Sequence, residues 1–305
     1  MNILVTGASG FLGQHITEEL EKSHSIYELK SDLRDHLEVR NEVLEQNPDM
    51  IVHLAARTEV EQSFYEQITF SEVNYVGTVN LIEAASKLKN LKNFVFASTM
   101  EVYGWQPISD EVIKHKIPEK SVAFDENTAP IPNAPYAIAK YACEKYLEYA
   151  HRCLGLPFTA LRQTNCYGRK DNSYFVTEQI ISQMLSNPDE CNLGYEEPYR
   201  NFIFVDDMID AWLAVINNPE KCNDGQIFTI GPDDPIKIKD YAALIAKKLS
   251  WKGKINWDTR PFRAGEIYWL NSNNNLITEK LGWKPKTSLD EGLDRTIEIW
   301  KKKLA

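Results

Sequence analysis

Three glycines follow the first apolar segment of this chain and limit what that segment can become. Asn2-Ile3-Leu4-Val5 has the composition of a short buried strand, and Thr6-Gly-Ala-Ser-Gly-Phe-Leu-Gly13 comes directly after it. Glycines at this spacing allow a tight turn, a close approach of the backbone to a diphosphate, and close packing of a helix on a sheet. The helix that begins here offers free N–H groups to an anion. We therefore expect a dinucleotide to bind at Gly7, Gly10, Phe11, Leu12 and Gly13.

Apolar runs alternate with amphipathic stretches through the first half of the chain. Strands are expected near residues 2–5, 25–29, 50–54, 94–98 and 157–161, and helices near 11–23, 37–46, 72–88 and around Tyr136. Continuous apolar strands separated by helices are typical of a parallel sheet with both faces covered. The pattern predicts an α/β protein with a doubly wound parallel sheet, a Rossmann fold, in residues 1–168.

The second half of the chain is less regular. Helices are expected near residues 176–185, 206–217, 238–249 and 288–302. We expect residues 169–305 to form mainly a smaller mixed α/β C-terminal lobe that binds the substrate. A strand near 225–231 is expected to return to the sheet of the first domain.

Composition and charge argue against several kinds of partner. The formal net charge is −10, so a broad basic face that binds a nucleic acid is not expected. Apolar runs stay below the roughly 18 residues of a membrane span, so no membrane partner is expected. The chain enters its first strand without the features of a signal peptide. Five cysteines without a metal-binding spacing are typical of a reduced cytoplasmic protein, and no metal site is expected.

The preference between NAD and NADP depends on the end of the second strand. An acidic residue there binds the ribose in folds that prefer NAD, but the stretch Glu28-Leu-Lys-Ser31 occupies this position. Lys30 can accept a 2′-phosphate, which favours NADP over NAD, although it can also be a solvated surface lysine. The adenine side of the site is expected to be walled by Asp32, Leu33, Leu54, Ala55 and Ala56.

Two tyrosine–lysine pairs with the same spacing lie in the expected helix near residue 136. Tyr136 and Lys140 share one helix face, as do Tyr141 and Lys145. At about 100° per residue the two pairs point roughly 140° apart, so at most one pair faces a given pocket. A lysine ammonium beside a tyrosine lowers the tyrosine pKa and lets the phenol exchange a proton with an alcohol near neutral pH.

Several motifs follow the glycine turn in a fixed order. They are Leu54-Ala-Ala56, Asn74-x-x-Gly-Thr78, Phe96-Ala-Ser-Thr-Met-Glu-Val-Tyr-Gly104, Pro135-Tyr-Ala-Ile-Ala-Lys140, Arg162-Gln-Thr-Asn165, Arg200-Asn-Phe-Ile-Phe-Val-Asp206 and Leu281-Gly-Trp-Lys-Pro285. With this set the chain resembles the extended short-chain dehydrogenase/reductases. More closely, it is similar to the NAD(P)-dependent nucleotide-sugar epimerase/dehydratase family over essentially its full length.

The resemblance implies which tyrosine–lysine pair is catalytic. The family's tyrosine follows a proline, as Tyr136 follows Pro135, which leaves Tyr141 and Lys145 as background. Lys140 would hold the nicotinamide ribose and lower the pKa of Tyr136. Thr99 would hydrogen-bond the reacting sugar oxygen, although a threonine at a strand end can also be purely structural.

Glu101 and Met100 bear on the type of reaction. The resemblance to sugar 4,6-dehydratases and UDP-glucuronate decarboxylases implies that a carboxylate at Glu101 removes the C5 proton once C4 is a ketone. A glutamate that only caps or pairs locally is the alternative. Met100 departs from dTDP-glucose dehydratases, which carry an aspartate there as the acid for the C6 hydroxyl, because methionine cannot donate a proton.

Three polar residues are candidates for holding the diphosphate of a nucleotide-activated sugar. By the resemblance these are Asn165, Arg200 and Arg263, and a guanidinium binds phosphate through two parallel hydrogen bonds. Surface ion pairing is the alternative for each arginine.

The sequence therefore predicts an enzyme that oxidises the C4 of a nucleotide sugar with bound NAD(P) and then dehydrates or epimerises it. One alternative is an NADPH-dependent 4-keto nucleotide-sugar reductase, and another is a catalytically inactive protein that senses a dinucleotide. The resemblance also implies a homodimer that packs through the helix after Val73 and the helix of Tyr136.

Overall fold

A six-stranded parallel sheet forms the centre of the structure, a computed structural model that describes residues 1–104, 122–260 and 265–304. Its strand order is β10-β5-β4-β3-β1-β2, and every neighbouring pair is parallel. The predicted doubly wound Rossmann sheet is confirmed. The strands are β1 (Asn2–Thr6), β2 (Ser25–Glu28), β3 (Met50–His53), β4 (Asn93–Thr99), β5 (Phe158–Gln163) and β10 (Asp224–Ile230).

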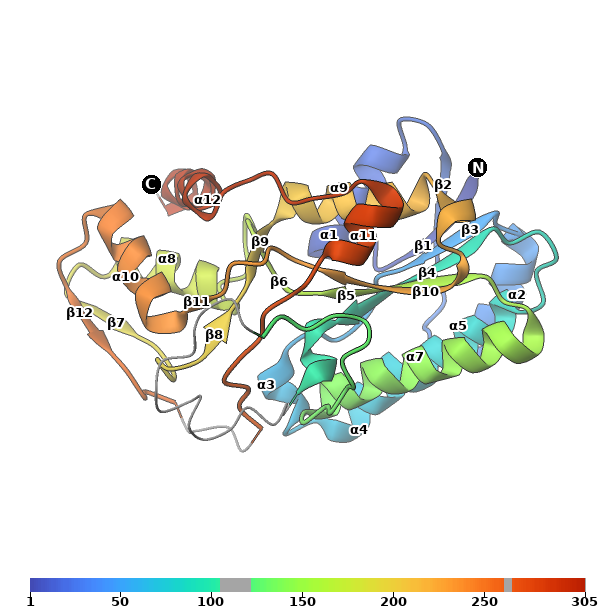
Figure 1. The fold of residues 1–305 in the computed structure, drawn as a ribbon, viewed down its shortest axis with the longest axis horizontal. Helices are drawn as coiled ribbons and strands as arrows, with labels where there is room; N and C mark the ends of the chain where they lie inside the picture. The colour runs from blue at the N-terminus through green and yellow to red at the C-terminus, as the bar shows by residue number, and fades with distance from the viewer. Residues whose placement is uncertain (105–121, 261–264, 305) are drawn as a thin grey trace.

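Alternate residues of these strands pack against helices on opposite faces of the sheet. Ile3 and Val5 join one apolar cluster and Leu4 joins the other, as the two-residue period of a strand requires. One face is covered by α1 (Phe11–Leu20) and α9 (Val205–Ile216). The other is covered by α2 (His36–Gln46), α5 (Gly77–Ala85) and α7 (Pro135–Leu154) (Figure 1).

The segment expected to be one helix over 72–88 contains two kinds of helix. A π-helix, η1 (Ser71–Val76), runs directly into α5, and two short helices, α3 (Val60–Ser63) and α4 (Gln67–Phe70), precede it. Apolar periodicity does not distinguish the wider π turn from an α turn, and this explains the difference.

The second lobe lies at the opposite end of the molecule from β2 and α2 (Figure 1). It contains three two-stranded pairings, β6 with β9, β8 with β11, and β7 with β12. Its elements are β6 (Asn165–Tyr167), α8 (Val176–Ser186), β7 (Glu190–Asn192), β8 (Tyr199–Arg200), β9 (Phe202–Phe204), β11 (Ile236–Lys237), α10 (Ile238–Leu249), β12 (Lys254–Asn256) and α12 (Leu289–Leu304); η3 (Pro219–Lys221) and α11 (Asn275–Leu281) flank β10. The domain boundary at residue 168 stays a prediction.

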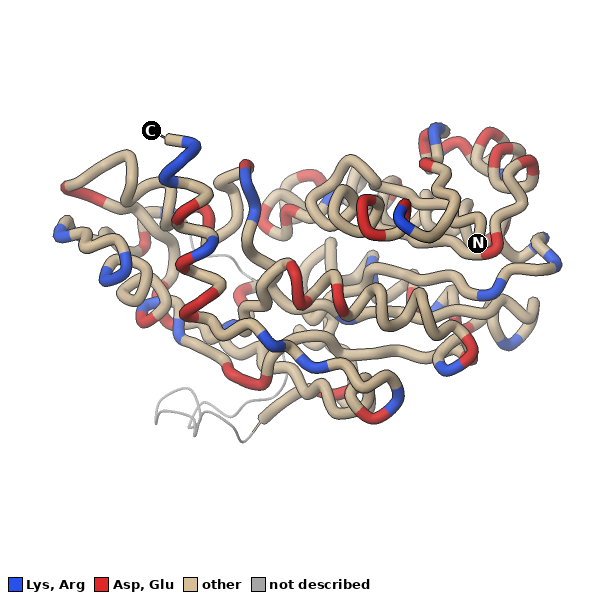
Figure 2. The backbone as a smooth tube through the Cα atoms, turned by 90° about the horizontal axis from the view of Figure 1, so that it is seen from above, with Lys and Arg blue, Asp and Glu red and all other residues tan. Residues whose placement is uncertain are grey.

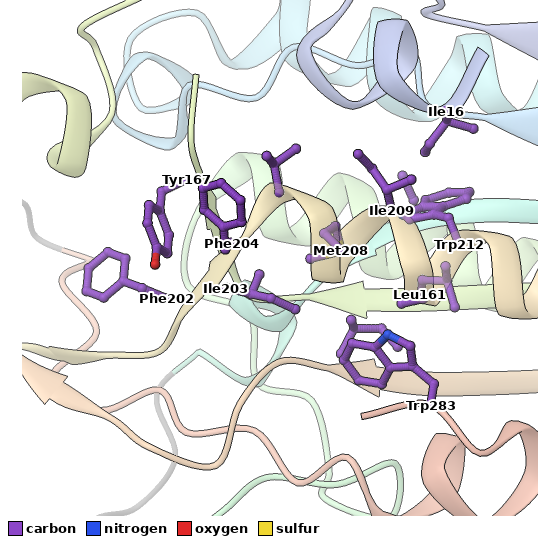
Figure 3. Packing of buried hydrophobic residues seen from close by; sticks show 14 of the residues in the cluster. Ile16, Leu161, Tyr167, Phe202, Ile203, Phe204, Met208, Ile209, Trp212 and Trp283 are labelled. Atoms are coloured by element: carbon purple, nitrogen blue, oxygen red, sulfur yellow. The ribbon is translucent and has the colours of Figure 1, made fainter. Parts of the chain in front are cut away.

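One apolar cluster joins the two lobes. Ile16 of α1, Leu161 of β5 and Trp212 of α9 belong to the same buried cluster as Phe202 and Phe204 of β9, and Figure 3 shows these side chains packed together. This shared core fixes the second lobe beside the carboxyl ends of the sheet strands.

Charged residues of both signs are interspersed along the described backbone (Figure 2). Within the same part of the chain, none of the helices has both the length and the apolar character needed to span a membrane.

Candidate active site

The glycine turn packs its backbone against the end of β3. Gly7 has a φ of +73°, and a Cβ added to it would lie 2.7 Å from the Ala55 nitrogen. A Cβ on Gly13 would lie 2.0 Å from the Gly7 carbonyl oxygen. Any side chain at either position would therefore push α1 away from the sheet. The close packing leaves the start of α1 exposed to the adjoining cavity.

A cavity of about 1080 Å³ lies at the carboxyl ends of the sheet strands, between the two lobes. This volume is slightly above the range of about 300–1,000 Å³ that is typical of a ligand-binding pocket. The cavity brings together most of the predicted residues, namely Gly7, Gly10, Phe11, Leu12, Gly13, Leu54, Ala55, Ala56, Thr99, Met100, Glu101, Tyr136, Lys140, Asn165 and Arg200.

Three predicted cofactor residues lie outside the lining of this cavity. Lys30 is exposed and its Nζ lies 3.3 Å from Glu28 Oε2. Asp32 pairs with Arg34, whose guanidinium lowers the pKa of that carboxyl to about 2. Leu33 is buried beside α5, where Asn80 Nδ2 donates to its carbonyl oxygen. Their roles stay predictions, and Arg263 lies outside the residues that the structure describes.

Thr99 connects Glu101 to Tyr136. Thr99 ends β4 and begins the 3₁₀ turn η2 (Met100–Tyr103), where its Oγ1 accepts the Glu101 N–H at 3.2 Å. The Thr99 side chain also lies close enough to the Tyr136 hydroxyl to lower the pKa of that phenol. While its oxygen accepts the Glu101 amide, the Thr99 hydroxyl can still donate its own proton to another group.

The pKa of Tyr136 is higher than the sequence leads one to expect. Burial is the largest cause of the rise, the Glu101 carboxylate adds to it, and the neighbouring Thr99 side chain opposes it. This is opposite to the lowering expected from Lys140. Lys140 does not lower the Tyr136 pKa because its ammonium is directed to other groups. It donates to the Ala97 carbonyl oxygen at 2.8 Å and lies 4.8 Å from the centre of the Phe96 ring.

Lys140 is buried, and this lowers its pKa to about 8, while the Glu144 carboxylate acts in the opposite direction. The second pair, Tyr141 and Lys145, lies outside the cavity lining. Lys145 Nζ is 2.8 Å from Glu148 Oε1 and 5.1 Å from the centre of the Tyr141 ring. Of the two pairs, the first therefore lines the cavity, and its catalytic role stays a prediction.

Arg200 and Asn165 line the part of the cavity formed by the second lobe. Arg200 Nη2 donates to Glu266 Oε1 at 2.9 Å, and both side chains are buried. Asn165 Nδ2 donates to the Asn201 carbonyl oxygen at 3.3 Å. The parallel pairing of β6 with β9 sets Asn165 opposite Phe202, two residues after Arg200. Both polar groups thus reach one wall of the cavity.

Two further cavity residues, Glu266 and Arg169, were not predicted from the sequence. The Arg169 guanidinium carbon lies 4.3 Å from the centre of the Phe11 ring and 3.8 Å from that of Phe175. The two rings come from the glycine turn and from the start of α8, so the arginine stacks between the lobes. The sequence carried a weak signal for Glu266, which lies three residues after the predicted Arg263.

This geometry defines a class of protein. A Rossmann sheet with a glycine turn after its first strand, and a tyrosine and lysine on the same cavity, is the architecture of a short-chain dehydrogenase/reductase. The chain belongs to the NAD dependent epimerase/dehydratase family, whose model matches residues 3–231. It is an NAD(P)-dependent enzyme of the extended type, and the resemblance drawn from the motifs is confirmed.

Known relatives cover almost the whole chain. The dTDP-D-glucose 4,6-dehydratase of Mus musculus is 26% identical over 98% of this chain and 88% of its own length. The UDP-glucuronate 4-epimerase 4 of Arabidopsis thaliana is 25% identical over 97% and 74%. A solved structure of the UDP-glucose 4-epimerase of Thermotoga maritima with UDP-glucose is 28% identical, covers 100% of both chains and superposes with a TM-score of 0.85.

Proposed function

We propose that this enzyme oxidises the C4 hydroxyl of a nucleotide-activated sugar with bound NAD(P) and then dehydrates or epimerises the 4-keto sugar. The observation that carries the proposal is the shared position of Thr99, Glu101 and Tyr136 on the cavity that also contains the glycine turn. Relatives with dehydratase and 4-epimerase names support the same reaction classes.

The residues at the start of α1 fit a dinucleotide. A side chain at Gly7 or Gly13 would collide with backbone, so the turn keeps its amides close to the cavity, and helix N-terminal amides favour a diphosphate. Lys140 and Tyr136 lie on the same cavity, where a nicotinamide ribose would be held. The bound nicotinamide supplies a hydride acceptor and donor, and everything else in the reaction falls to side chains.

Tyr136 is the group we assign to the C4 hydroxyl proton. Its own pKa is raised by burial, so the phenolate needs a stabilising partner before it can act as a base at neutral pH. The Thr99 side chain lowers the phenol pKa, whereas the buried Lys140 ammonium, one helical turn away, donates to the Ala97 carbonyl oxygen. The Glu101 carboxylate raises the Tyr136 pKa, and this favours return of the proton in a later step.

Glu101 is the group we assign to the C5 proton. Its carboxylate is close enough to Tyr136 to raise the phenol pKa, so both groups can face one sugar ring. Met100 is buried among apolar residues and cannot protonate a leaving hydroxyl. If water is eliminated, Tyr136 or a water molecule must supply that proton. Dehydration is therefore favoured by Glu101, and epimerisation needs only Tyr136.

Arg200 and Asn165 are proposed to hold the diphosphate of the sugar nucleotide, together with Arg263. The Arg200 guanidinium already donates to Glu266 and to the Tyr199 carbonyl oxygen, and its remaining N–H donors can serve a phosphate oxygen. The base of the nucleotide is left open by these contacts.

Product analysis tests the proposal. The purified protein would be incubated with NAD⁺ or NADP⁺ and with UDP-glucose or dTDP-glucose in D₂O, and products would be read by mass spectrometry and NMR. Loss of water with deuterium in the product supports dehydration, and a C4 epimer of unchanged mass supports epimerisation. A separate incubation with NADPH and a 4-keto sugar tests the reductase alternative. If that incubation consumes NADPH while neither sugar nucleotide reacts, the proposal is wrong.

For the cofactor we propose NADP over NAD, on the strength of Lys30. Its exposed ammonium lies just beyond the end of β2, where a 2′-phosphate would approach. Glu28, the last residue of β2, acts in the other direction, because its carboxylate repels a phosphate and can bind a ribose hydroxyl. The relative affinity for the two cofactors decides which of these charges controls the site.

A homodimer is proposed for the face formed by α4, η1 and α7. Apolar side chains are exposed along it, among them Ile68, Val76, Ile138 and Tyr149. Helix pairs from two copies would cover this strip as a four-helix bundle. Light scattering at micromolar concentration tests the dimer, and a monomer would reject it.

A cytoplasmic location is proposed from the cysteine content alone.

A further inference from the structure

A buried chain of hydrogen bonds lies directly behind the proposed catalytic residues. Glu144 of α7 accepts from Arg162 of β5 through both carboxylate oxygens, at 3.0 and 2.7 Å. Ser98 of β4 donates to the same carboxylate at 2.5 Å. Glu144 has no exposed surface, and the Arg162 and Ser98 residues are 3% exposed. The ion pair is thus removed from water and held by directional bonds on three elements.

The hydrogen-bond network continues from Arg162 to the η2 turn. Arg162 Nη1 donates to the Tyr103 hydroxyl oxygen at 3.0 Å. The Tyr103 hydroxyl donates to the Asp125 carbonyl oxygen at 2.6 Å and lies 3.0 Å from Thr229 Oγ1 of β10. The phenol is therefore used as donor and acceptor at once, and its ring is fully buried. Tyr103 cannot shift without breaking bonds to three separate segments.

The residues at both ends of this hydrogen-bond network lie close in sequence to groups assigned to the reaction. Ser98 precedes Thr99, Tyr103 follows Glu101 by two residues, and Glu144 lies one helical turn after Lys140 and two turns after Tyr136. Ser98 is paired with Arg162 across the strands β4 and β5. The cavity lining includes Ser98, Thr99, Glu101, Tyr136 and Lys140 but excludes Tyr103, Glu144 and Arg162.

We propose that Tyr103, Arg162 and Glu144 are positioning residues that hold the Glu101 turn and the Tyr136 helix at a fixed separation. The inference rests on the proposed function, because it assumes that Glu101 and Tyr136 act on the same sugar ring. A network that only stabilised the fold would affect folding alone. A positioning network affects the chemical steps, since an error of about 1 Å in the placement of a reacting group can cost about a hundredfold in rate.

Tyr103→Phe is the sharpest test, because it removes one oxygen and leaves the Glu144–Arg162 ion pair in place. We expect kcat for the sugar nucleotide that the wild type converts to fall about tenfold or more, with KM and the cofactor Kd changed less than about twofold. Hydrogen–deuterium exchange of the amides in residues 99–104 should become faster. Ser98→Ala, which frees the other end of the chain and is a smaller change, should lower kcat in the same way.

Thr159→Val is the matched control. Thr159 lies on β5, three residues before Arg162, and is fully buried. The valine variant removes two hydrogen bonds that lie away from the cavity, one from Asn93 and one to the Cys222 carbonyl oxygen. It should leave kcat and the exchange of residues 99–104 unchanged. Unchanged exchange in Tyr103→Phe would overturn the proposal, and so would wild-type kcat in both Tyr103→Phe and Ser98→Ala, or equal losses in Thr159→Val.

The exchange measurement separates this inference from the proposed function. If the wild type converts neither UDP-glucose nor dTDP-glucose and instead consumes NADPH with a 4-keto sugar, the proposed function is contradicted, but exchange of residues 99–104 still reports on the network. Faster exchange in Tyr103→Phe alone supports the link between the network and the turn. Unchanged exchange in that variant rejects it, whatever the activity.

Discussion

The guanidinium of Arg200 and the carboxylate of Glu266 form a buried ion pair at 2.9 Å in the wall of the cavity. The pair keeps the arginine in place on the cavity and compensates its charge. Breaking a buried pair costs about 3–5 kcal/mol because one charge is left without a partner. A phosphate that enters this part of the cavity shares an arginine whose orientation Glu266 has already fixed.

Arg200→Lys is expected to weaken binding of the sugar nucleotide. Lysine keeps the charge but loses the planar fork that serves Glu266 and a phosphate together. Hydrogen bonds to charged groups contribute about 1.5–3 kcal/mol, so KM should rise roughly tenfold to a hundredfold. Steady-state kinetics measures this, and Arg295→Lys, at an exposed pair with Asp206, serves as the control. An unchanged KM would remove Arg200 from the proposed site.

Tyr136→Phe should lower kcat by about a hundredfold to ten-thousandfold, because proton transfer by a positioned group contributes that much. Cofactor binding, measured by fluorescence titration, should stay within about twofold. Tyr141→Phe tests the neighbouring pair with the same spacing and should retain full activity. Full activity in Tyr136→Phe, or a similar loss in Tyr141→Phe, would contradict the assignment of the catalytic tyrosine.

Glu101→Gln should separate the two halves of the reaction. Oxidation at C4 depends on Tyr136 and should persist, so the absorbance of reduced nicotinamide should accumulate on mixing with substrate. Exchange of the C5 proton with D₂O, followed by NMR, should fall about a hundredfold or more. If C5 exchange continues at the wild-type rate, another group removes that proton.

The buried Lys140 predicts a particular dependence of stability on pH. Burial lowers its pKa from 10.5 to about 8, so between these values the unfolded chain binds more protons than the folded chain. The free energy of unfolding contributed by this group therefore rises with pH, on the order of 1 kcal/mol between pH 7 and 9. Urea unfolding should show this slope in the wild type and not in Lys140→Met.

Above that range a second buried group opposes the effect. Burial raises the pKa of Cys143 from 9.0 to about 12, so its contribution to stability falls as pH rises above 9. The comparison of the wild type with Lys140→Met is therefore made below pH 9. Identical slopes in the two proteins would show that Lys140 titrates normally.

Lys30→Ala should weaken NADP binding more than NAD binding. A surface charge contact with phosphate is screened by water, so a loss of about threefold to tenfold is expected for NADP and almost none for NAD. Calorimetry with each cofactor measures the ratio, and Lys22→Ala, at an exposed pair with Glu19, is the control. An equal loss of affinity for both cofactors, or no loss for either, would show that Lys30 does not set the preference for NADP and would point to Glu28 instead.

Much of the sheet could be predicted because its signals are local, and most of the predicted site residues line one cavity. The apolar runs at β1, β3, β4 and β5 were visible as strands, and the choice of Tyr136 over Tyr141 as the catalytic tyrosine stays a prediction. The strand pairings of the second lobe were not predicted, because β7, β8 and β11 have two or three residues each and carry no readable period. The π-helix before α5 was missed because apolar periodicity does not distinguish a π turn from an α turn.

The sequence by itself determined the glycine turn, the order of the motifs and the residue types available for chemistry, since each depends on neighbours in the chain. The tertiary structure decided which distant groups meet. It set the Glu101 carboxylate near the Tyr136 phenol, turned the Lys140 ammonium to the Ala97 carbonyl, and paired Arg200 with Glu266. These contacts join residues far apart in the chain, and burial controls their charges, so no local pattern in the sequence encodes them.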